Sequence, residues 1–343
     1  MATSPPLLAV IDDALFLEHR APESHPERPE RLLAVRRGIE RATGGSEPLA
    51  LPARDATDDE LARVHTQRHI EQLGQSAGKS GYYDADTYFC AESSAAARRA
   101  AGAASVLIET LTQGTRFAAA LVRPPGHHAR PDTAMGFCLL NNVAVAAAKA
   151  RASGRERVMI VDFDVHHGNG TQEMFYDDPS VLYVSLHQFP FYPGTGSAEE
   201  VGDEEGRGFT VNVPLSAGAG DAVYRAAFDR LIHPITAQFA PDLLLLSAGF
   251  DAHTRDPLAE MTLSENAYAY MVSSLLGAIG QEVPVGLLLE GGYDLVGLES
   301  STKRSVEALL GGQADPISGQ ISATHEADLA SAERVQRAYW KLP

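Results

Sequence analysis

The segment 158–170 constrains the fold more than any other part of the chain. It starts as an apolar run, continues into Asp162, Asp164 and His166, and ends in a Gly-Asn-Gly turn. Such a run leading into ionisable side chains is typical of a buried parallel strand with a ligand site at its carboxyl end. Because the three side chains alternate with apolar residues, an extended strand would point them to one face. Burying them together is costly unless they are paired or bind a cation, so we expect a metal site.

Apolar strand-like runs alternate with helical patterns along the chain. The predicted strands are 7–11, 117–122, 158–164, 181–186, 243–247 and 285–289. The predicted helices are 27–42, 93–111, 142–151, 222–239, 264–276 and 298–310. Strands separated by helices imply βαβ crossovers and a parallel sheet covered on both faces, which is an α/β fold.

Length and composition favour one large globular domain. The chain has 343 residues, of which 44% are hydrophobic and 21% charged, and no Ser/Gly/Pro-rich linker divides it. We therefore expect a single domain over 1–343, with 313–343, which is polar and Ala-rich, as a peripheral C-terminal arm.

Several partners and locations are disfavoured. No run reaches the roughly 18 apolar residues of a membrane span, and the first residues lack the pattern of a secretion signal. Two cysteines, Cys90 and Cys138, suit a reducing cytoplasm, so we expect a cytoplasmic protein without membrane contact. The net charge of −17 argues against direct nucleic-acid binding, and it is compatible with cationic substrates.

Chemically versatile residues follow four of the predicted strands. They occupy 123–128, 162–167, 249–251 and 290–293. Ligand sites of parallel sheets lie beyond the carboxyl ends of the strands, so these four segments are expected to meet in one site.

A catalytic divalent metal usually has three protein ligands and one open position. Asp164 and His166 supply two of them, and Asp251 is the most plausible third, although by itself it fits a helix cap or a turn equally well. Two carboxylates and one imidazole suit zinc or ferrous iron, and the sequence does not choose between them.

His127 and His128 follow an Arg-Pro-Pro-Gly turn. A lone buried histidine is more often a core residue, but two adjacent ones at a strand exit favour acid–base chemistry. Asp162 and Asn169 are their expected orienting partners. In Glu-Gly-Gly-Tyr, the glycines allow close backbone approach, so that Tyr293 could donate to a developing oxyanion; without the other motifs it would be a packed tyrosine.

Together these segments resemble the arginase/deacetylase superfamily, and specifically the class II histone deacetylase-like amidohydrolases. The resemblance covers nearly the whole chain and includes further motifs at 25–32, 136–138, 141–142 and 193–196. It implies a single-domain open three-layer α/β/α fold with a mainly parallel sheet of about eight strands.

The resemblance also implies roles for individual residues. Zinc would be bound by Asp164, His166 and Asp251, and the catalytic set would be His127, His128, Asp162, Asn169 and Tyr293. Asn169 stands where the class I enzymes have an aspartate, so His128 is expected to be less basic than a carboxylate-backed histidine. A tyrosine at 293, in place of the histidine of weakly active relatives, predicts a competent deacetylase.

Substrate and potassium sites follow from the same resemblance. Gly136 and Phe137 match the wall of the acyl-lysine channel, Tyr192 or its neighbour Phe191 would face Phe137, and Asp86 matches the rim acid. The first potassium ion would be held by Asp162, Asp164, His166, Ser185 and Leu186. The second would be held by Phe175, Asp178, Val181 and Phe209.

The leading functional hypothesis is hydrolysis of N-ε-acetyl-lysine, which releases acetate. Acetylpolyamine hydrolysis by the same site is the main alternative. Arginase-like chemistry at a two-manganese centre needs more carboxylates near each strand end, and only one three-ligand set is visible in the sequence. A binder that has lost catalysis usually lacks a metal ligand, a histidine or the tyrosine, and all of these are present here. The family includes monomers, dimers and tetramers, so a homo-oligomer is possible.

Overall fold

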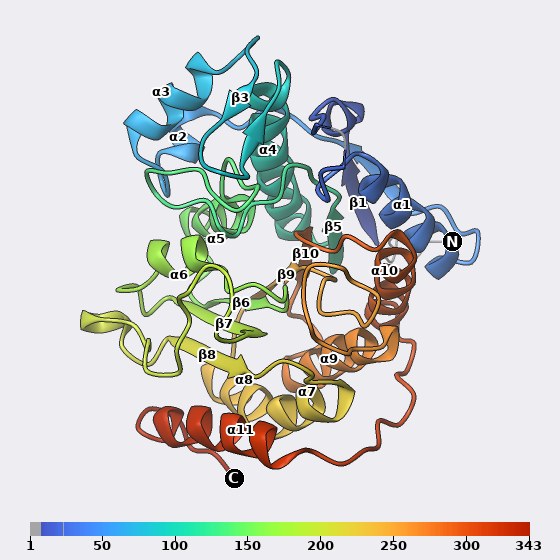
Figure 1. Cartoon of the computed structure of the whole chain (residues 1–343), viewed down its shortest axis with the longest axis vertical. Helices are drawn as coiled ribbons and strands as arrows, with labels where there is room; N and C mark the ends of the chain where they lie inside the picture. The colour runs from blue at the N-terminus through green and yellow to red at the C-terminus, as the bar shows by residue number, and fades with distance from the viewer. Residues whose placement is uncertain (1–7, 23) are drawn as a thin grey trace.

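The core of the computed structural model, which describes residues 8–22 and 24–343, is an eight-stranded sheet (Figure 1). In spatial order its strands are β2 (Leu49–Pro52), β1 (Ala9–Asp12), β5 (Phe117–Ala120), β10 (Val285–Leu289), β9 (Leu243–Ala248), β6 (Val158–Asp162), β7 (Val181–Gln188) and β8 (Thr210–Leu215). All neighbouring strands of this sheet pair in parallel. The predicted α/β fold with about eight parallel strands is therefore confirmed.

Helices form a layer on either side of the sheet. One layer consists of α1 (Glu30–Ala42), α10 (Leu295–Leu309), α9 (Glu265–Ala278), α7 (Asp221–Ala227) and α8 (His233–Phe239). In this layer α1 contacts α10, α10 contacts α9, and α9 contacts both α7 and α8. The other is built on α4 (Ser93–Thr112) and α5 (Asn142–Ala152), which pack together and against the central strands. None of the helices in the described part of the chain combines the length and apolar character needed to cross a bilayer.

The central strands are apolar because both of their faces are covered. Every residue of β6, β9 and β10 is buried, so their sequences show no polar alternation and are apolar apart from Asp162 and Ser247 near the carboxyl ends of β6 and β9. This is why the sequence located them within a few residues. The predicted strand at 7–11 starts on Leu7, which lies outside the described residues, and β1 spans Ala9–Asp12.

The predicted strand at 158–164 is too long, because β6 ends at Asp162. Beyond it, the Asp164 amide donates to Oδ1 of Asp162 (3.2 Å) and the His166 amide donates to Oδ1 of Asp164 (2.9 Å). These side-chain bonds replace the ladder bonds of a strand and turn the backbone out of the sheet. The expectation that Asp162, Asp164 and His166 share one face of an extended strand is therefore wrong.

Two helix predictions need correction. The helix expected at 27–42 begins only at Glu30, after Pro29, whose fixed φ suits a helix start. The helix expected at 222–239 is divided into α7, the π-helical turn η3 (Phe228–Ile232) and α8. Pro234 has no amide proton to continue the α-helical pattern, and the chain widens into π geometry immediately before it.

Both edge strands and the smaller elements of the fold were not predicted from the sequence. β2 is short and largely exposed, and β8 contains Pro214, a residue that edge strands tolerate. The remaining elements are η1 (Ala14–Leu17), α2 (Asp58–Leu61), α3 (Gln67–Gln75), the antiparallel pair β3 (Gly81–Tyr82) and β4 (Tyr88–Phe89), α6 (Asn169–Met174), η2 (Glu204–Gly206) and α11 (Ala323–Gln336).

The C-terminal segment lies at one end of the sheet. α11 packs against β8 (Figure 1). After it, the indole Nε1 of Trp340 donates to the carbonyl oxygen of Gly208 (3.0 Å). The segment therefore covers the edge strand that would otherwise be exposed.

The sheet order places the site. β5, β10, β9 and β6 are consecutive neighbours at the centre of the sheet. Because all four strands are parallel, their carboxyl ends lie at the same edge of the sheet. The segments with chemically versatile residues, 123–128, 162–167, 249–251 and 290–293, follow those ends.

Candidate active site

The expected metal ligands lie together beyond the ends of β6 and β9. Nδ1 of His166 is 3.1 Å from Oδ1 of Asp164 and 3.1 Å from Oδ2 of Asp251. One ligand atom from each of the three residues lies within 4.8 Å of the others. The structure thus brings all three predicted ligands to a single point.

Backbone amides hold the oxygens of the two carboxylates that face away from His166. Gly291 donates to Oδ2 of Asp164 and Val165 donates to Oδ1 of Asp251, both at 2.8 Å. The Gly291 backbone can approach this closely only without a side chain, since a Cβ would lie 2.3 Å from Oδ2 of Asp251. These bonds orient the ligands as an outer shell orients a metal site.

The two buried carboxylates of this cluster, Asp164 and Asp251, favour binding of a cation. Burial and the like charge of Asp164 raise the pKa of Asp251 to about 7. Although burial opposes its charged form, bonds to Asp164 and Asp251 raise the pKa of His166 to about 10. A proton on His166 therefore takes the position that a divalent ion would occupy, and the oxygen and nitrogen donors suit such an ion.

The two predicted catalytic histidines lie beside the metal ligands, with ring centroids 4.0 Å apart. Nδ1 of His127 is 3.0 Å from Oδ2 of Asp162, and Nδ1 of His128 is 2.8 Å from Oδ1 of Asn169. Both partner atoms are oxygens that accept a hydrogen bond, so each histidine carries a proton on Nδ1. The Nε2 atom of each ring is then free of these bonds and available for proton transfer. The predicted pairing of one histidine with a carboxylate and the other with an amide is what the structure shows.

These different partners separate the proton affinities of the two rings. Burial disfavours protonation of His127, but Asp164 and Asp162 outweigh it and raise its pKa to about 10. Burial and the neighbouring His127 and His166 lower the pKa of His128 well below its ordinary value. The amide of Asn169 supplies no charge to oppose this, so His128 is the less basic ring, as the sequence predicted.

Tyr293 enters the site from the segment after β10, and two residues without an assigned role fix it there. The Asp256 carboxylate accepts the Tyr293 amide at 2.6 Å. Arg31 donates to the carbonyl oxygens of Gly292 (2.6 Å) and Glu290 (2.5 Å) and lies over the phenol ring. Burial raises the pKa of Tyr293 well above its ordinary value, so the phenol keeps its proton. Neither contact could be read from the sequence, because each joins distant segments.

A narrow cavity of about 250 Å³ leads to these groups. Its lining includes all four predicted substrate-contacting residues, Gly136, Phe137, Tyr192 and Asp86, with His128, His166, Phe191, Leu258 and Tyr293. Phe191 stacks on the His166 ring and Tyr192 meets the His128 ring edge-on. Both aromatic candidates therefore line the channel, whereas Leu258 was not foreseen.

Glu290 is a further buried acid whose role the sequence left open. Its Oε2 accepts the amides of Gly126 (2.6 Å) and His127 (3.1 Å), which fixes the turn carrying the histidines. His127, Glu290 and Cys138 also form a cluster with metal-ligand spacing. These bonds already occupy Glu290, and burial raises the pKa of the Cys138 thiol, so this cluster is a packed support for the site.

The residues expected to hold potassium lie on one side of the site. Asp162 on β6 is in register with Ser185 on β7, next to Leu186, and the loop with Asp164 and His166 follows. The second group surrounds the turn before β7, where the amide of Val181 donates to the carbonyl of Asp178 (3.3 Å) and that of Asp178 to Phe175 (3.2 Å). Phe209 accepts the amide of Tyr183 at 2.9 Å.

Comparison with known proteins identifies similar chains. The histone deacetylase domain family matches residues 25–309. Histone deacetylase 15 of Arabidopsis thaliana is 42% identical over 93% of this chain, polyamine deacetylase HDAC10 of Homo sapiens is 40% identical over 93%, and a probable deacetylase of Archaeoglobus fulgidus is 38% identical over 87%. The matches cover 59%, 50% and 84% of those proteins, so the chain spans between half and three fifths of the first two.

A solved structure shares the fold. The crystal structure of the HDA15 HD domain superposes with a TM-score of 0.90 at 40% identity, covering 97% of this chain and 95% of that domain. The sheet and the helical layers described above therefore belong to a known architecture.

Proposed function

The chain belongs to the histone deacetylase family, and on that premise we propose that it hydrolyses acetylated amines, preferentially the ε-acetyl amide of lysine. Water adds to the amide carbonyl, the C–N bond breaks, and acetate and a free amine result. The observation that carries the proposal is the convergence of Asp164, His166 and Asp251 at one point, where His166 also lines the channel together with His128 and Tyr293.

Zinc is the proposed cofactor, and ferrous iron is the alternative, since both accept two carboxylates and one imidazole. When bound, such an ion polarises the substrate carbonyl and makes a bound water acidic. Asp164, Asp251 and Nδ1 of His166 would hold it. The amides of Gly291 and Val165 keep the carboxylates oriented for that purpose.

We assign proton transfer to the histidine pair. His128 presents an unprotonated Nε2 to the channel, so it can accept the proton of the attacking water. The leaving amine must gain a proton, and the pair of His127 and His128 can donate to it the proton that was taken from the water. Asp162 stabilises a positive charge on His127 throughout.

Tyr293 is proposed to stabilise the oxyanion. Its phenol is protonated and lines the channel, and Asp256 and Arg31 fix its backbone. A preorganised donor of this kind contributes about 3 kcal/mol to transition-state stabilisation.

The channel favours a slender aliphatic chain. The rings of Phe137 and Tyr192 can cover the methylene groups of an acyl-lysine, and His128 and His166 mark the reacting end. Asp86 at the rim is proposed to accept a backbone amide of the substrate. The protein partner is therefore an acetylated polypeptide.

An acetylpolyamine is the second candidate substrate. It is favoured by the 40% identity to polyamine deacetylase HDAC10 and by a carboxylate, Asp86, at the rim that could pair with a distant ammonium group. Both substrates use the same reacting groups, so turnover on matched substrates distinguishes them.

Potassium ions are proposed at both expected positions. The first set combines the buried carboxylate of Asp162 with the hydroxyl of Ser185, oxygen donors suited to a hard cation. An ion there would compensate the Asp162 charge behind His127.

The decisive experiment measures turnover of an acetyl-lysine peptide, acetylputrescine and acetylspermidine by the purified protein, together with bound metal by elemental analysis. We expect about one zinc per chain, higher kcat/KM on the peptide, and inhibition by a hydroxamate chelator. Turnover of none of the three substrates by metal-loaded protein would overturn the proposal, and faster turnover of the polyamines would select the second candidate.

Replacement of Tyr293 by Phe tests the oxyanion donor. Removing this hydroxyl should lower kcat by roughly 100-fold while the metal content stays unchanged. Tyr339→Phe is the matched control, since that exposed phenol lies in the C-terminal segment and contacts Arg207. Equal activity of the Tyr293→Phe variant and the wild type would exclude the assigned role.

A further inference from the structure

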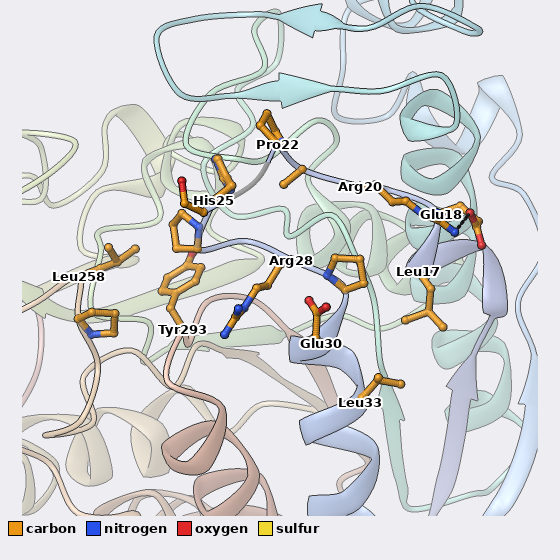
Figure 2. Close-up of a pocket in the computed structure, with 15 residues that line it drawn as sticks. Leu17, Glu18, Arg20, Pro22, His25, Arg28, Glu30, Leu33, Leu258 and Tyr293 are labelled. Atoms are coloured by element: carbon orange, nitrogen blue, oxygen red, sulfur yellow. Dashed lines mark hydrogen bonds and ion pairs between the residues drawn. The ribbon is translucent and has the colours of Figure 1, made fainter.

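A second, larger hollow adjoins the channel. This groove has a volume of about 930 Å³ and lies between the segment preceding α1 and the loop after β9 (Figure 2). Tyr293 and Leu258 line both the groove and the channel, so these two residues form a shared wall. Asp256 holds this wall, because its carboxylate accepts the amides of Tyr293 (2.6 Å) and Leu258 (3.0 Å).

The groove starts at the mouth of the channel. His25, which lines the groove, packs edge-on against the Phe137 ring of the channel wall, with centroids 4.7 Å apart. Its Nε2 is 3.2 Å from the carbonyl oxygen of Asp86 at the rim. A polypeptide that inserts a lysine side chain into the channel and contacts Asp86 can therefore continue over His25 into the groove.

The groove has an apolar floor. Leu17, Leu33 and a series of prolines that includes Pro22 and Pro29 contribute to it. Leu33 keeps 40% of its surface exposed, although α1 otherwise turns its apolar side chains inward. Apolar surface beside a reaction channel is suited to cover the side chains and backbone of a bound peptide.

Among the described residues, the groove contains a cation without an ion-pair partner, Arg28. Arg20 pairs with Glu18 at 2.8 Å, and Arg31 pairs with Glu27. In contrast, exposed Arg28 has no ion-pair partner among residues 8–22 and 24–343. Figure 2 shows its guanidinium between Tyr293 and Glu30, on the side of the groove nearer the shared wall.

We propose that this groove binds the part of a polypeptide that flanks the acetyl-lysine, and that Arg28 selects an acidic side chain close to that lysine. This inference rests on the proposed deacetylation and adds the substrate's sequence class. The proposal depends on charge complementarity between Arg28 and the acidic side chain. The net charge of −17 repels acidic peptides over most of the surface, so an exposed arginine beside the channel is a local site of attraction. Glu30 lies farther from the shared wall and would face residues farther from the lysine.

The test uses peptides that differ only in charge. Four acetyl-lysine peptides carry Asp or Lys at the two positions before, or the two positions after, the acetyl-lysine. The readout is the ratio of kcat/KM for the Asp and Lys members of each pair, which cancels changes in the chemical step. A partly exposed ion pair predicts a ratio of about two to five in favour of Asp on one side of the lysine.

Arg28 variants assign the preference. We expect Arg28→Gln to bring the ratio near one and Arg28→Glu to invert it. Arg63→Glu is the matched control: Arg63 is also exposed, lies next to α2 and makes the same change in net charge. It should keep the wild-type ratio.

The possible results distinguish failure of the groove proposal from failure of the proposed deacetylation. A wild-type ratio near one for both pairs, or the same ratio change in Arg63→Glu as in Arg28→Glu, overturns the groove proposal while deacetylation stands. Failure of the metal-loaded wild type to hydrolyse any of the four peptides removes the peptide deacetylation on which the groove proposal rests, and turnover of acetylputrescine or acetylspermidine by the same sample then decides whether the proposed amide hydrolysis stands.

Discussion

The guanidinium carbon of Arg31 lies 4.9 Å from the ring centroid of Tyr293, while its nitrogens bond the carbonyl oxygens of Gly292 and Glu290. The arginine comes from the first turn of α1 and the tyrosine from the segment after β10. Glu27 pairs with Arg31 at 3.0 Å and also with Arg123, so one buried carboxylate is shared by two arginines. Arg31 is thus a positioning residue: it fixes the backbone on either side of Gly291 and lowers the otherwise raised pKa of the phenol.

Arg31→Lys should retain the charge but lose the fork that reaches two carbonyls. We expect kcat to fall roughly 10- to 100-fold, because small displacements of a reacting group are costly. Arg36→Lys on the same helix, where the arginine pairs with Asp12, is the control and should keep full activity. The measurement is kcat and KM on an acetyl-lysine peptide. A rise in KM with unchanged kcat would contradict a role through Tyr293.

Asn169→Asp should shift the pH dependence of the reaction. A carboxylate beside Nδ1 raises the pKa of His128, so the ring becomes protonated at higher pH and stops acting as a base there. The acidic limb of the kcat/KM profile is therefore expected to move by about one unit toward higher pH. Metal content should be measured in parallel. An unmoved acidic limb at normal metal content would show that His128 is not the base.

Gly291→Ala should disrupt metal binding. The new Cβ would lie 2.3 Å from Oδ2 of Asp251 and 2.5 Å from Oδ2 of Asp164, so both ligands must move. We expect zinc affinity to fall by about tenfold or more, as measured by competition with a chelator. Gly277→Ala on α9 is the matched control, since nothing lies within 4 Å of its added Cβ. It should retain zinc affinity and gain slight stability. Undiminished affinity in Gly291→Ala would mean that the ligands tolerate the displacement.

His65 should make the fold sensitive to acid. It lies away from the metal ligands, where its Nε2 accepts the Asn141 amide (2.9 Å) and its Nδ1 faces the Arg130 carbonyl (3.1 Å). Burial and neighbouring His69 lower the pKa of His65 to about 3. Below the unfolded value of about 6.5 the unfolded chain binds the proton first, so stability falls as the pH decreases toward 3.

Urea unfolding of metal-free wild type and His65→Gln at pH 7.0, 5.5 and 4.5 measures this contribution. Glutamine can make both hydrogen bonds without titrating. The advantage of the wild type should be largest at pH 7.0 and shrink by about 1.4 kcal/mol per pH unit in the acidic range. Parallel pH profiles would show that His65 does not titrate on unfolding.

The sequence was sufficient for the central strands of the fold and for the chemically versatile segments that follow them. β6, β9 and β10 are buried on both faces, so their apolar runs can have few other structures. β2 and β8 left weaker patterns because edge strands are short or tolerate proline. Pro234 was a readable signal for the break in the helix expected at 222–239.

The contacts that support the site could not be predicted from local sequence patterns. Asp164, His166 and Asp251 could be grouped because each follows a strand and offers a metal-binding atom. Arg31 contacts Glu290 across 259 positions, and no periodicity relates such distant residues. Leu258 looks like an ordinary loop residue until the fold places it between the channel and the groove.

β10 has a consequence for the biosynthesis of the protein. It pairs with β5 on one side and β9 on the other, although it is the last of the eight strands to be synthesised. A ribosome-bound chain that stops before Val285 holds two half-sheets with no strand to join them, and it also lacks Tyr293. The site is therefore completed late in translation, and we expect products that end before Val285 to lack the proposed hydrolase activity.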